Sequence, residues 1–345
     1  MTQSSDAVVP LGAIRFNSDS QKLEYWMGSA WMQIKTFSPN LAESGDNAAG
    51  VRAIAGGGAG PSGTPDFVQF FNMASSGNAA DFGDLPQRQY LTSGTSSRTR
   101  GVFMGGYTNS PSSTYINSIQ SVEIAQLSSA SDFGDLTQTA GYTGSVGNQT
   151  RAVRVGGTGP SNPGTNTMDF VTIAVKADAV DYGDLSGSNN NSNNINNPVR
   201  GIIQTYEAGT LNRTQFITIP TTGNAQTFGE LIKVRQDGAG MSNSIRGIYC
   251  GGSPLPVAFM EYVTISTTGN GTTFGDLSTI TFREGGHASP VRGVISGGMG
   301  VSPYPTLDIL QSVNFATEGD AVDFGDLDKA RYEHASISNG HGGLG

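Results

Sequence analysis

The chain has 345 residues, of which 49 are glycine and only 14% are charged, and its net charge is −9. An acidic surface repels phosphate, so we expect no nucleic-acid partner. The single cysteine, Cys250, excludes an internal disulfide framework and a cysteine-based zinc cluster, and the lack of any run of 18 apolar residues excludes a helix inserted in a membrane.

Residues 1–40 lie outside the repeat that fills the rest of the chain. Apolar and polar residues alternate around Ile14 and again around Leu23, and turn residues separate these runs, which predicts a small β-meander. So small a sheet cannot bury enough area alone. We therefore predict that residues 1–40 are a β-hairpin attachment module, with four aromatic side chains as its contacts: Phe16, Tyr25, Trp26 and Trp31.

This segment carries a recognisable pattern, Gly-x-Ile-Arg-Phe-Asn at residues 12–17 and Leu-Glu-Tyr-Trp-x-Gly-x-x-Trp at residues 23–31. The pattern resembles a short module of bacteriophage tail and fibre proteins. The resemblance implies a virion structural protein of the tail, neck or fibre, made in the host cytoplasm and bound to other virion proteins through residues 1–40. A homo-oligomer within the particle is compatible with it.

From about residue 41 onward the chain is built from one repeat. A pentapeptide close to Asp-Phe-Gly-Asp-Leu, called here the FGDL motif, occurs six times at spacings of 46 to 51 residues. Its central aromatic residues are Phe82, Phe133, Tyr182, Phe228, Phe274 and Phe324. An arginine-led apolar run, usually ending in Gly-Gly, recurs in phase with it, and an alternating run such as residues 170–174 lies between the two.

These elements predict a β-propeller. Each repeat of about 48 residues offers three clear strands, and a fourth, weaker one fits the variable stretch after each FGDL motif. Good helix formers are scarce, which favours an all-β chain. We predict a six-bladed propeller over residues 41–345, with residues 331–345 as a closing strand; a seven-bladed ring is the alternative.

The repeat resembles the kelch propeller family, in which an apolar strand ends in Gly-Gly and is followed by an alternating strand and an aromatic-bearing outer strand. Four diglycines carry the resemblance: 105–106, 156–157, 251–252 and 297–298. The Tyr and Trp pair usual in kelch blades is absent here, and the FGDL motif takes the aromatic position. The resemblance implies a kelch-like fold.

Two charged positions recur once per repeat. The arginines are Arg52, Arg100, Arg151, Arg200, Arg246 and Arg292, and the acids of the FGDL motif are Asp84, Asp135, Asp184, Glu230, Asp276 and Asp326. Because a charge is kept at each copy, we hypothesise arginine–carboxylate pairs that join strands or adjacent blades. Independent solvated charges are the alternative.

The sequence offers no catalytic, cofactor-binding or metal-binding set. The three histidines lack ligand spacing, and Asp-Phe-Gly is a strand repeat here rather than part of a kinase site. We therefore expect a non-enzymatic protein without a cofactor, acting as an attachment or protein-interaction propeller.

The alternative function is a carbohydrate-binding propeller that recognises a glycan on the host surface. Its support is the asparagine-rich segment 186–198, otherwise expected to be a flexible surface loop, and the tyrosine-bearing loops at Tyr107, Tyr115 and Tyr304.

Overall fold

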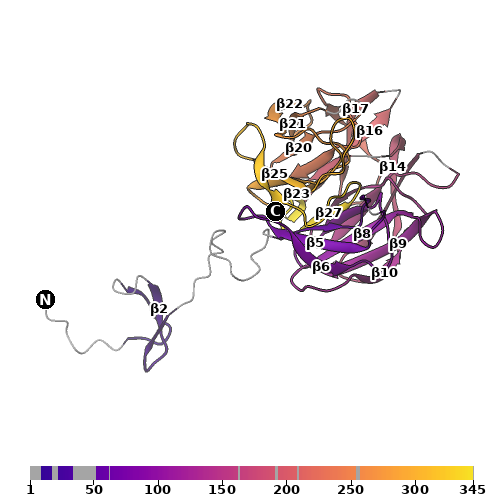
Figure 1. The fold of residues 1–345 in the computed structure, drawn as a ribbon. Coiled ribbons are helices and arrows are strands. Elements are labelled where there is room, and N and C mark those ends of the chain that lie inside the picture. The colour runs from indigo at the N-terminus through magenta and orange to yellow at the C-terminus, as the bar shows by residue number, and fades with distance from the viewer. Residues whose placement is uncertain are drawn as a thin grey trace. The chain divides into compact units, whose positions relative to one another are not determined.

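A computed structural model describes residues 9–17, 22–33, 52–61, 63–161, 164–190, 193–207, 210–253 and 257–344. Within them the chain is all-β, as the composition predicts, apart from the 3₁₀ helix η1 (Gly342–Leu344). The chain divides into two compact units, residues 1–48 and 49–345 (Figure 1).

The first unit holds one antiparallel sheet of three strands. These are β1 (Ile14–Asn17), β2 (Lys22–Trp26) and β3 (Trp31–Gln33), in the order β1-β2-β3. Ile14 lies opposite Tyr25, and Tyr25 lies opposite Met32, so these three side chains share one face of the sheet.

The second unit holds six antiparallel sheets of four strands each. In strand order, the sheets are β27 (Ala335–Ser338), β4 (Arg52–Gly56), β5 (Phe67–Asn72) and β6 (Ala80–Asp84); β7 (Ser93–Ser96), β8 (Arg100–Thr108), β9 (Thr114–Glu123) and β10 (Ser131–Asp135); β11 (Gly144–Gly147), β12 (Arg151–Val155), β13 (Thr165–Thr172) and β14 (Val180–Asn189); β15 (Asn194–Asn196), β16 (Arg200–Glu207), β17 (Thr210–Thr218) and β18 (Gln226–Glu230); β19 (Ala239–Ser242), β20 (Arg246–Cys250), β21 (Phe259–Thr264) and β22 (Thr272–Asp276); and β23 (Gly285–Ala288), β24 (Arg292–Ser296), β25 (Ile309–Asn314) and β26 (Val322–Asp326).

The sheets are offset by one strand from the sequence repeats. The strand that follows each FGDL motif pairs with the arginine-led strand of the next repeat, as β7 does with β8. The last such strand, β27, has no following repeat and pairs with β4 at the start of the unit, where Ile337 lies opposite Ile54. Figure 1 shows this return of the yellow C-terminal end to the indigo strands.

The first strands of the six sheets are neighbours in space. β7 lies beside β11, β11 beside β15, β15 beside β19, β19 beside β23, β23 beside β27, and β27 beside β7. Six apolar clusters lie between successive pairs of sheets. One of them joins Phe82 and Ile337 of one sheet to Phe103 and Ile124 of the next, so each sheet is covered on both faces by its neighbours.

The FGDL motif forms the outermost strand of each sheet, and its glycine allows that strand to approach the next sheet. At Gly83, with φ of +144°, an added Cβ would lie 2.7 Å from the backbone of Ser128. At Gly134, with φ of +154°, it would lie 2.6 Å from the carbonyl carbon of Ala177. A side chain would collide with a backbone that cannot move aside, so this position requires glycine.

The six repeat arginines do join adjacent sheets, but their partners are backbone carbonyls. Each guanidinium donates from Nη1 to the end of the third strand in the next sheet, with these acceptors in order: Ile124, Ile173, Ile219, Ser266, Phe315 and Met73. Four of them also stack on an aromatic ring of their own sheet, with Arg200 4.6 Å from the Phe216 centroid.

The hypothesis that these arginines pair with the FGDL acids is therefore wrong. All six acid side chains are exposed, and within the described residues no ion pair links them to a repeat arginine. What the acid position contributes to the joint is its backbone: the amide of Asp184 donates to Asn224, and its carbonyl accepts from Ala225. A carbonyl is available at any residue, so sequence pairing rules do not reveal this contact.

Replacing Arg200 with alanine removes its hydrogen bond to Ser266 and its stacking on Phe216. We expect a loss of about 2 kcal/mol in the free energy of unfolding, measured by chemical denaturation. Glu230→Ala, in the same sheet, removes an exposed charge and should change stability by less than about 0.5 kcal/mol. Equal losses in the two variants would contradict this account of the joint.

Candidate functional site

The three-stranded sheet of the first unit has an uncovered apolar face. It consists of five side chains brought together by the register of β1, β2 and β3, and all are exposed by 39% or more: Ile14, Phe16, Leu23, Tyr25 and Met32. We call this set the apolar face. Contiguous apolar surface on a soluble protein indicates a contact site.

The opposite face of this sheet is occupied by its own residues. Trp26 and Trp31 pack with ring centroids 5.4 Å apart, and the Arg15 guanidinium lies 4.2 Å from the Trp31 ring. Arg15 also pairs with the buried Glu24 at 2.9 Å. The four aromatic residues predicted for attachment therefore divide: Phe16 and Tyr25 lie on the apolar face, whereas the two tryptophans hold the sheet together.

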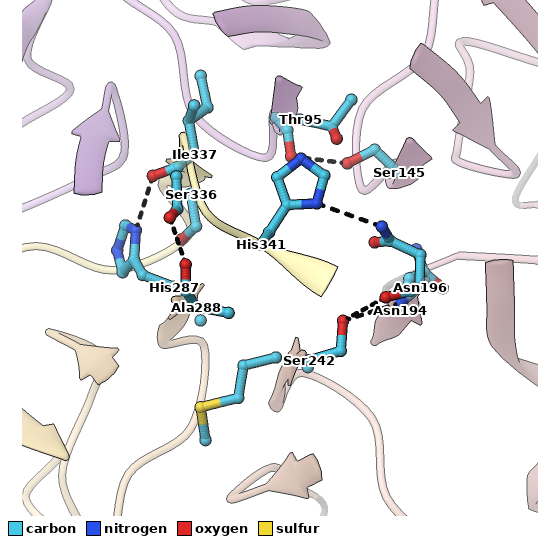
Figure 2. A pocket seen from close by; sticks show the side chains of 15 residues that line it. Thr95, Ser145, Asn194, Asn196, Ser242, His287, Ala288, Ser336, Ile337 and His341 are labelled. Atoms are coloured by element: carbon cyan, nitrogen blue, oxygen red, sulfur yellow. Dashed lines mark hydrogen bonds between the residues drawn. The ribbon is translucent and has the colours of Figure 1, made fainter. Parts of the chain in front are cut away.

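In the second unit, the six innermost strands enclose a small central cavity (Figure 2). Its volume is about 60 Å³, which holds about two water molecules. Its wall is polar, with Thr95, Ser145, Asn194, Ser242 and Ser336 among the lining side chains. The cavity is too small for a sugar or a peptide and fits only solvent.

The C-terminal segment lies at this cavity. His341 lines it, approaches the carbonyl of Ser96 at 2.8 Å through Nε2, and lies 3.2 Å from the amide nitrogen of Asn196 through Nδ1. Arg98 donates to the carbonyl of Leu344. Burial lowers the pKa of His341 to about 4, so its ring is neutral near pH 7.

Two histidines that are 47 residues apart in sequence meet at one serine. Ser296 Oγ lies 2.9 Å from His287 Nε2 and 2.8 Å from His334 Nε2. Ser296 is fully buried, and burial lowers the pKa of both imidazoles. A substrate cannot reach this hydroxyl, so the arrangement is a packing contact. Its only sequence signal is the position of both histidines near an innermost strand.

A ring of turn residues precedes the innermost strands. Five of them have left-handed backbones, with φ between 53° and 60°: Leu91, Tyr142, Asp237, Arg283 and Glu333. The amide of each donates to the carbonyl of the residue in the preceding sheet where both are described, as from Tyr142 to Leu91 and from Glu333 to Arg283. Such non-glycine conformations cost about 1 kcal/mol each or more, and these inter-sheet hydrogen bonds offset that cost.

The turns surround a cavity of about 140 Å³ that contains a charged cluster. The Nη1 of Arg283 lies 2.9 Å from Glu333 Oε1, and its Nε lies 3.7 Å from Asp237 Oδ2. Next to them, Glu284 is 7% exposed and neither carboxylate oxygen has a hydrogen-bond partner. Burial raises the pKa of Glu284 to about 8 and that of Glu333 to about 7.

Sequence reasoning missed one buried polar position in each sheet. It lies on the third strand, is no more than 2% exposed, and is occupied by Gln69, Gln120, Asp169, Gln215, Glu261 and Gln311. Asp169 accepts from the amide of Thr137 and from the buried Arg154, and Glu261 accepts from the amide of Ile232 and from the buried Arg235. The recurrence of Gln, Asp or Glu at this phase is the signal that would have found it.

The asparagine-rich segment is structured where it is described. Residues 186–189 belong to β14 and residues 194–196 to β15, so the expectation of a flexible loop is wrong there. Asn189, Asn193 and Asn196 are buried, and their amides donate to Gln204 and Gly147. These amides are engaged inside the protein rather than presented to a glycan.

The tyrosine-bearing loops contain ring contacts. Tyr107 packs edge-on against both Tyr90 and Tyr115, at centroid distances of 5.6 and 4.9 Å. Tyr304 is 53% exposed and packs against Phe282. Of the tyrosines named from sequence, Tyr304 presents the most surface.

A larger cavity, called here the side cavity, lies between the residues just before β5 and the loops after two FGDL motifs. Its volume is about 440 Å³. Pro65, Asp66, Phe67, Arg88 and Lys329 are among the residues that line it. This is the one described cavity above whose size falls within the ordinary range of small-molecule sites.

Comparisons with known proteins leave the chain unassigned: no family model matches it, and no curated protein does either. In the described part of the chain, His, Cys, Asp and Glu side chains form no group of three or more suited to a metal ion. Among the same residues, no helix is long and apolar enough to cross a bilayer.

The raised pKa of Glu284 predicts how its replacement depends on pH. A carboxyl whose pKa is higher folded than unfolded destabilises the fold as pH rises from about 4.5 to about 8. Glu284→Gln should therefore match the wild type near pH 4.5 and exceed its stability by a few kcal/mol near pH 8, measured by denaturation at both pH values. The exposed Glu230→Gln is the control, and a Glu284→Gln gain that does not grow with pH would refute the prediction.

Proposed function

We propose that this chain is a non-enzymatic structural protein of a bacteriophage virion, in the tail, neck or fibre, attached through residues 1–40. The observation that carries the attachment is the apolar face. Its five side chains lie on a sheet of three short strands, and its other face is already occupied by Trp26, Trp31 and Arg15. An isolated sheet of this size is marginal in water, so covering the apolar face with another virion protein stabilises the module.

The second unit, in this proposal, is a six-bladed kelch-like propeller. Three observations support it: six sheets of four strands, an apolar cluster between each successive pair, and first strands that are neighbours all the way round. The pairing of β27 with β4 supports a closing strand supplied by the C-terminal end. These sheets use every strand between Arg52 and Ser338, which favours six blades over seven.

The interior of the second unit supports a binding role over a catalytic one. The central cavity admits only water, and the Ser296 hydroxyl between the two histidines is fully buried. The acid and base groups of the turn cavity are paired with each other, apart from the neutral Glu284 carboxyl. Such a unit acts through its outer surface and its loops.

The second candidate function is recognition of a host-surface carbohydrate. The observation that favours it is the side cavity, which is open to solvent and combines charged, hydroxyl and proline side chains. The two functions are compatible, since a virion appendage can carry a receptor site.

Electron microscopy of the particle tests the proposal, with wild type compared to a deletion of residues 1–40. We expect a disc-shaped density on the tail, neck or fibre that the deletion loses. Absence of the protein from purified wild-type particles would rule out the virion role.

A charge on the apolar face should prevent attachment. Phe16→Asp places a carboxylate among Ile14, Leu23 and Tyr25, and we expect at least a tenfold lower amount of the protein on purified particles, measured by quantitative mass spectrometry. Ser29→Asp adds the same charge in the turn before β3 and serves as control. Incorporation of Phe16→Asp at the level of Ser29→Asp would contradict the docking role.

The closing strand also makes a testable prediction. Deletion of residues 335–345 removes β27 and leaves β4 as an open edge, and Ala335 and Ile337 are lost from the apolar cluster around Phe82. We expect the melting temperature to fall far more than after deletion of residues 341–345, which keeps β27, as measured by scanning calorimetry. Similar melting temperatures for the two truncated chains would argue against closure by β27.

A further inference from the structure

The side cavity carries more positive charge than its surroundings predict. The whole chain has a net charge of −9. At the side cavity, however, two exposed cations, Arg88 and Lys329, face a single acid, Asp66. Arg88 Nε lies 3.9 Å from Asp66 Oδ2, and both side chains are close to half exposed, at 59% and 45%. One cation therefore remains in excess at the opening.

A third cation lies behind the wall of the cavity. Arg331 is fully buried and donates to the carbonyls of Ala55 and Gly57. Its guanidinium carbon is 4.1 Å from the centroid of the Phe67 ring. Burial lowers the pKa of Arg331 to about 9, so the group is still charged at neutral pH and adds to the positive potential.

The remaining wall positions these charges. The Lys329 ammonium lies 4.6 Å from the centroid of the same Phe67 ring, which restricts it to the cavity side of its loop. Thr64 is 7% exposed, and Asn109 fixes its hydroxyl by donating to Oγ1 at 3.0 Å. Pro61 and Pro65 supply apolar surface next to these polar groups.

We propose that the side cavity binds a carboxylated saccharide. Arg88 and Lys329 pair with the sugar carboxylate, Asp66 accepts hydrogen bonds from neighbouring hydroxyls, and the proline rings pack against the C–H face of the ring. A simple inorganic anion would use the cations but neither the acid nor the prolines, and a neutral sugar would leave the excess cation unpaired. This inference deepens the second candidate function and does not depend on attachment through residues 1–40.

Isothermal titration of the full chain with three acidic oligosaccharides tests the site. The probes contain glucuronic, galacturonic or N-acetylneuraminic acid, and each is compared with its carboxyl-reduced form. We expect at least one acidic probe to bind and its reduced form to bind at least tenfold more weakly. Affinity should also fall as salt is raised, because the cations are exposed.

Two variants and a matched control locate the binding. Arg88→Gln and Lys329→Gln should each weaken binding at least tenfold. Lys233→Gln should leave it unchanged, because Lys233 lies in the same way over Phe259, with its Nζ 5.3 Å from the ring centroid, but does not line the side cavity.

The outcomes separate this proposal from the virion role. Failure of all three acidic probes to bind the wild type, or binding by Arg88→Gln and Lys329→Gln at wild-type affinity, overturns the side-cavity assignment alone. Loss of acidic-sugar binding by Arg88→Gln in a protein that still co-purifies with particles supports the site and leaves attachment through residues 1–40 unaffected.

Discussion

Covering both faces of each four-stranded sheet is the constraint on which the second unit depends. A single such sheet would leave one apolar face in water, and here every sheet has a neighbour on each side with an apolar cluster between them. The FGDL motif serves this packing directly. Its aromatic residue is buried in the cluster, and its glycine lets the outer strand approach the backbone of the next sheet.

Polar contacts then fix how adjacent sheets meet. The repeat arginine reaches a carbonyl in the next sheet, while the buried Gln, Asp or Glu of the third strand caps the loop that follows the FGDL motif. Near the centre, turn residues join the sheets through backbone hydrogen bonds. Because these contacts fill the interior with satisfied polar groups, little space is left there, and the larger cavity lies at the outside instead.

The first unit follows the opposite logic. Its three strands form one face stabilised by its own tryptophans and one face that nothing in the unit covers. That asymmetry is what links the short sheet to a partner in the proposed function. The side cavity belongs to the second unit, so attachment and recognition reside in different parts of the chain and can be tested separately.

The sequence by itself determined the all-β class, because glycine-rich turns, alternating strands and a sixfold repeat leave no room for helices. It also located the FGDL aromatics in the core, since their recurrence in phase with the strands reflects packing. The repeat showed that Arg200 and its five counterparts matter, but the tertiary structure decided that they bind carbonyls, because an acceptor on the backbone leaves no trace in the sequence. The same holds for the side cavity. Asp66 and Phe67 are about 260 residues from Lys329 and Arg331 along the chain, and only the return of β27 to β4 brings them together.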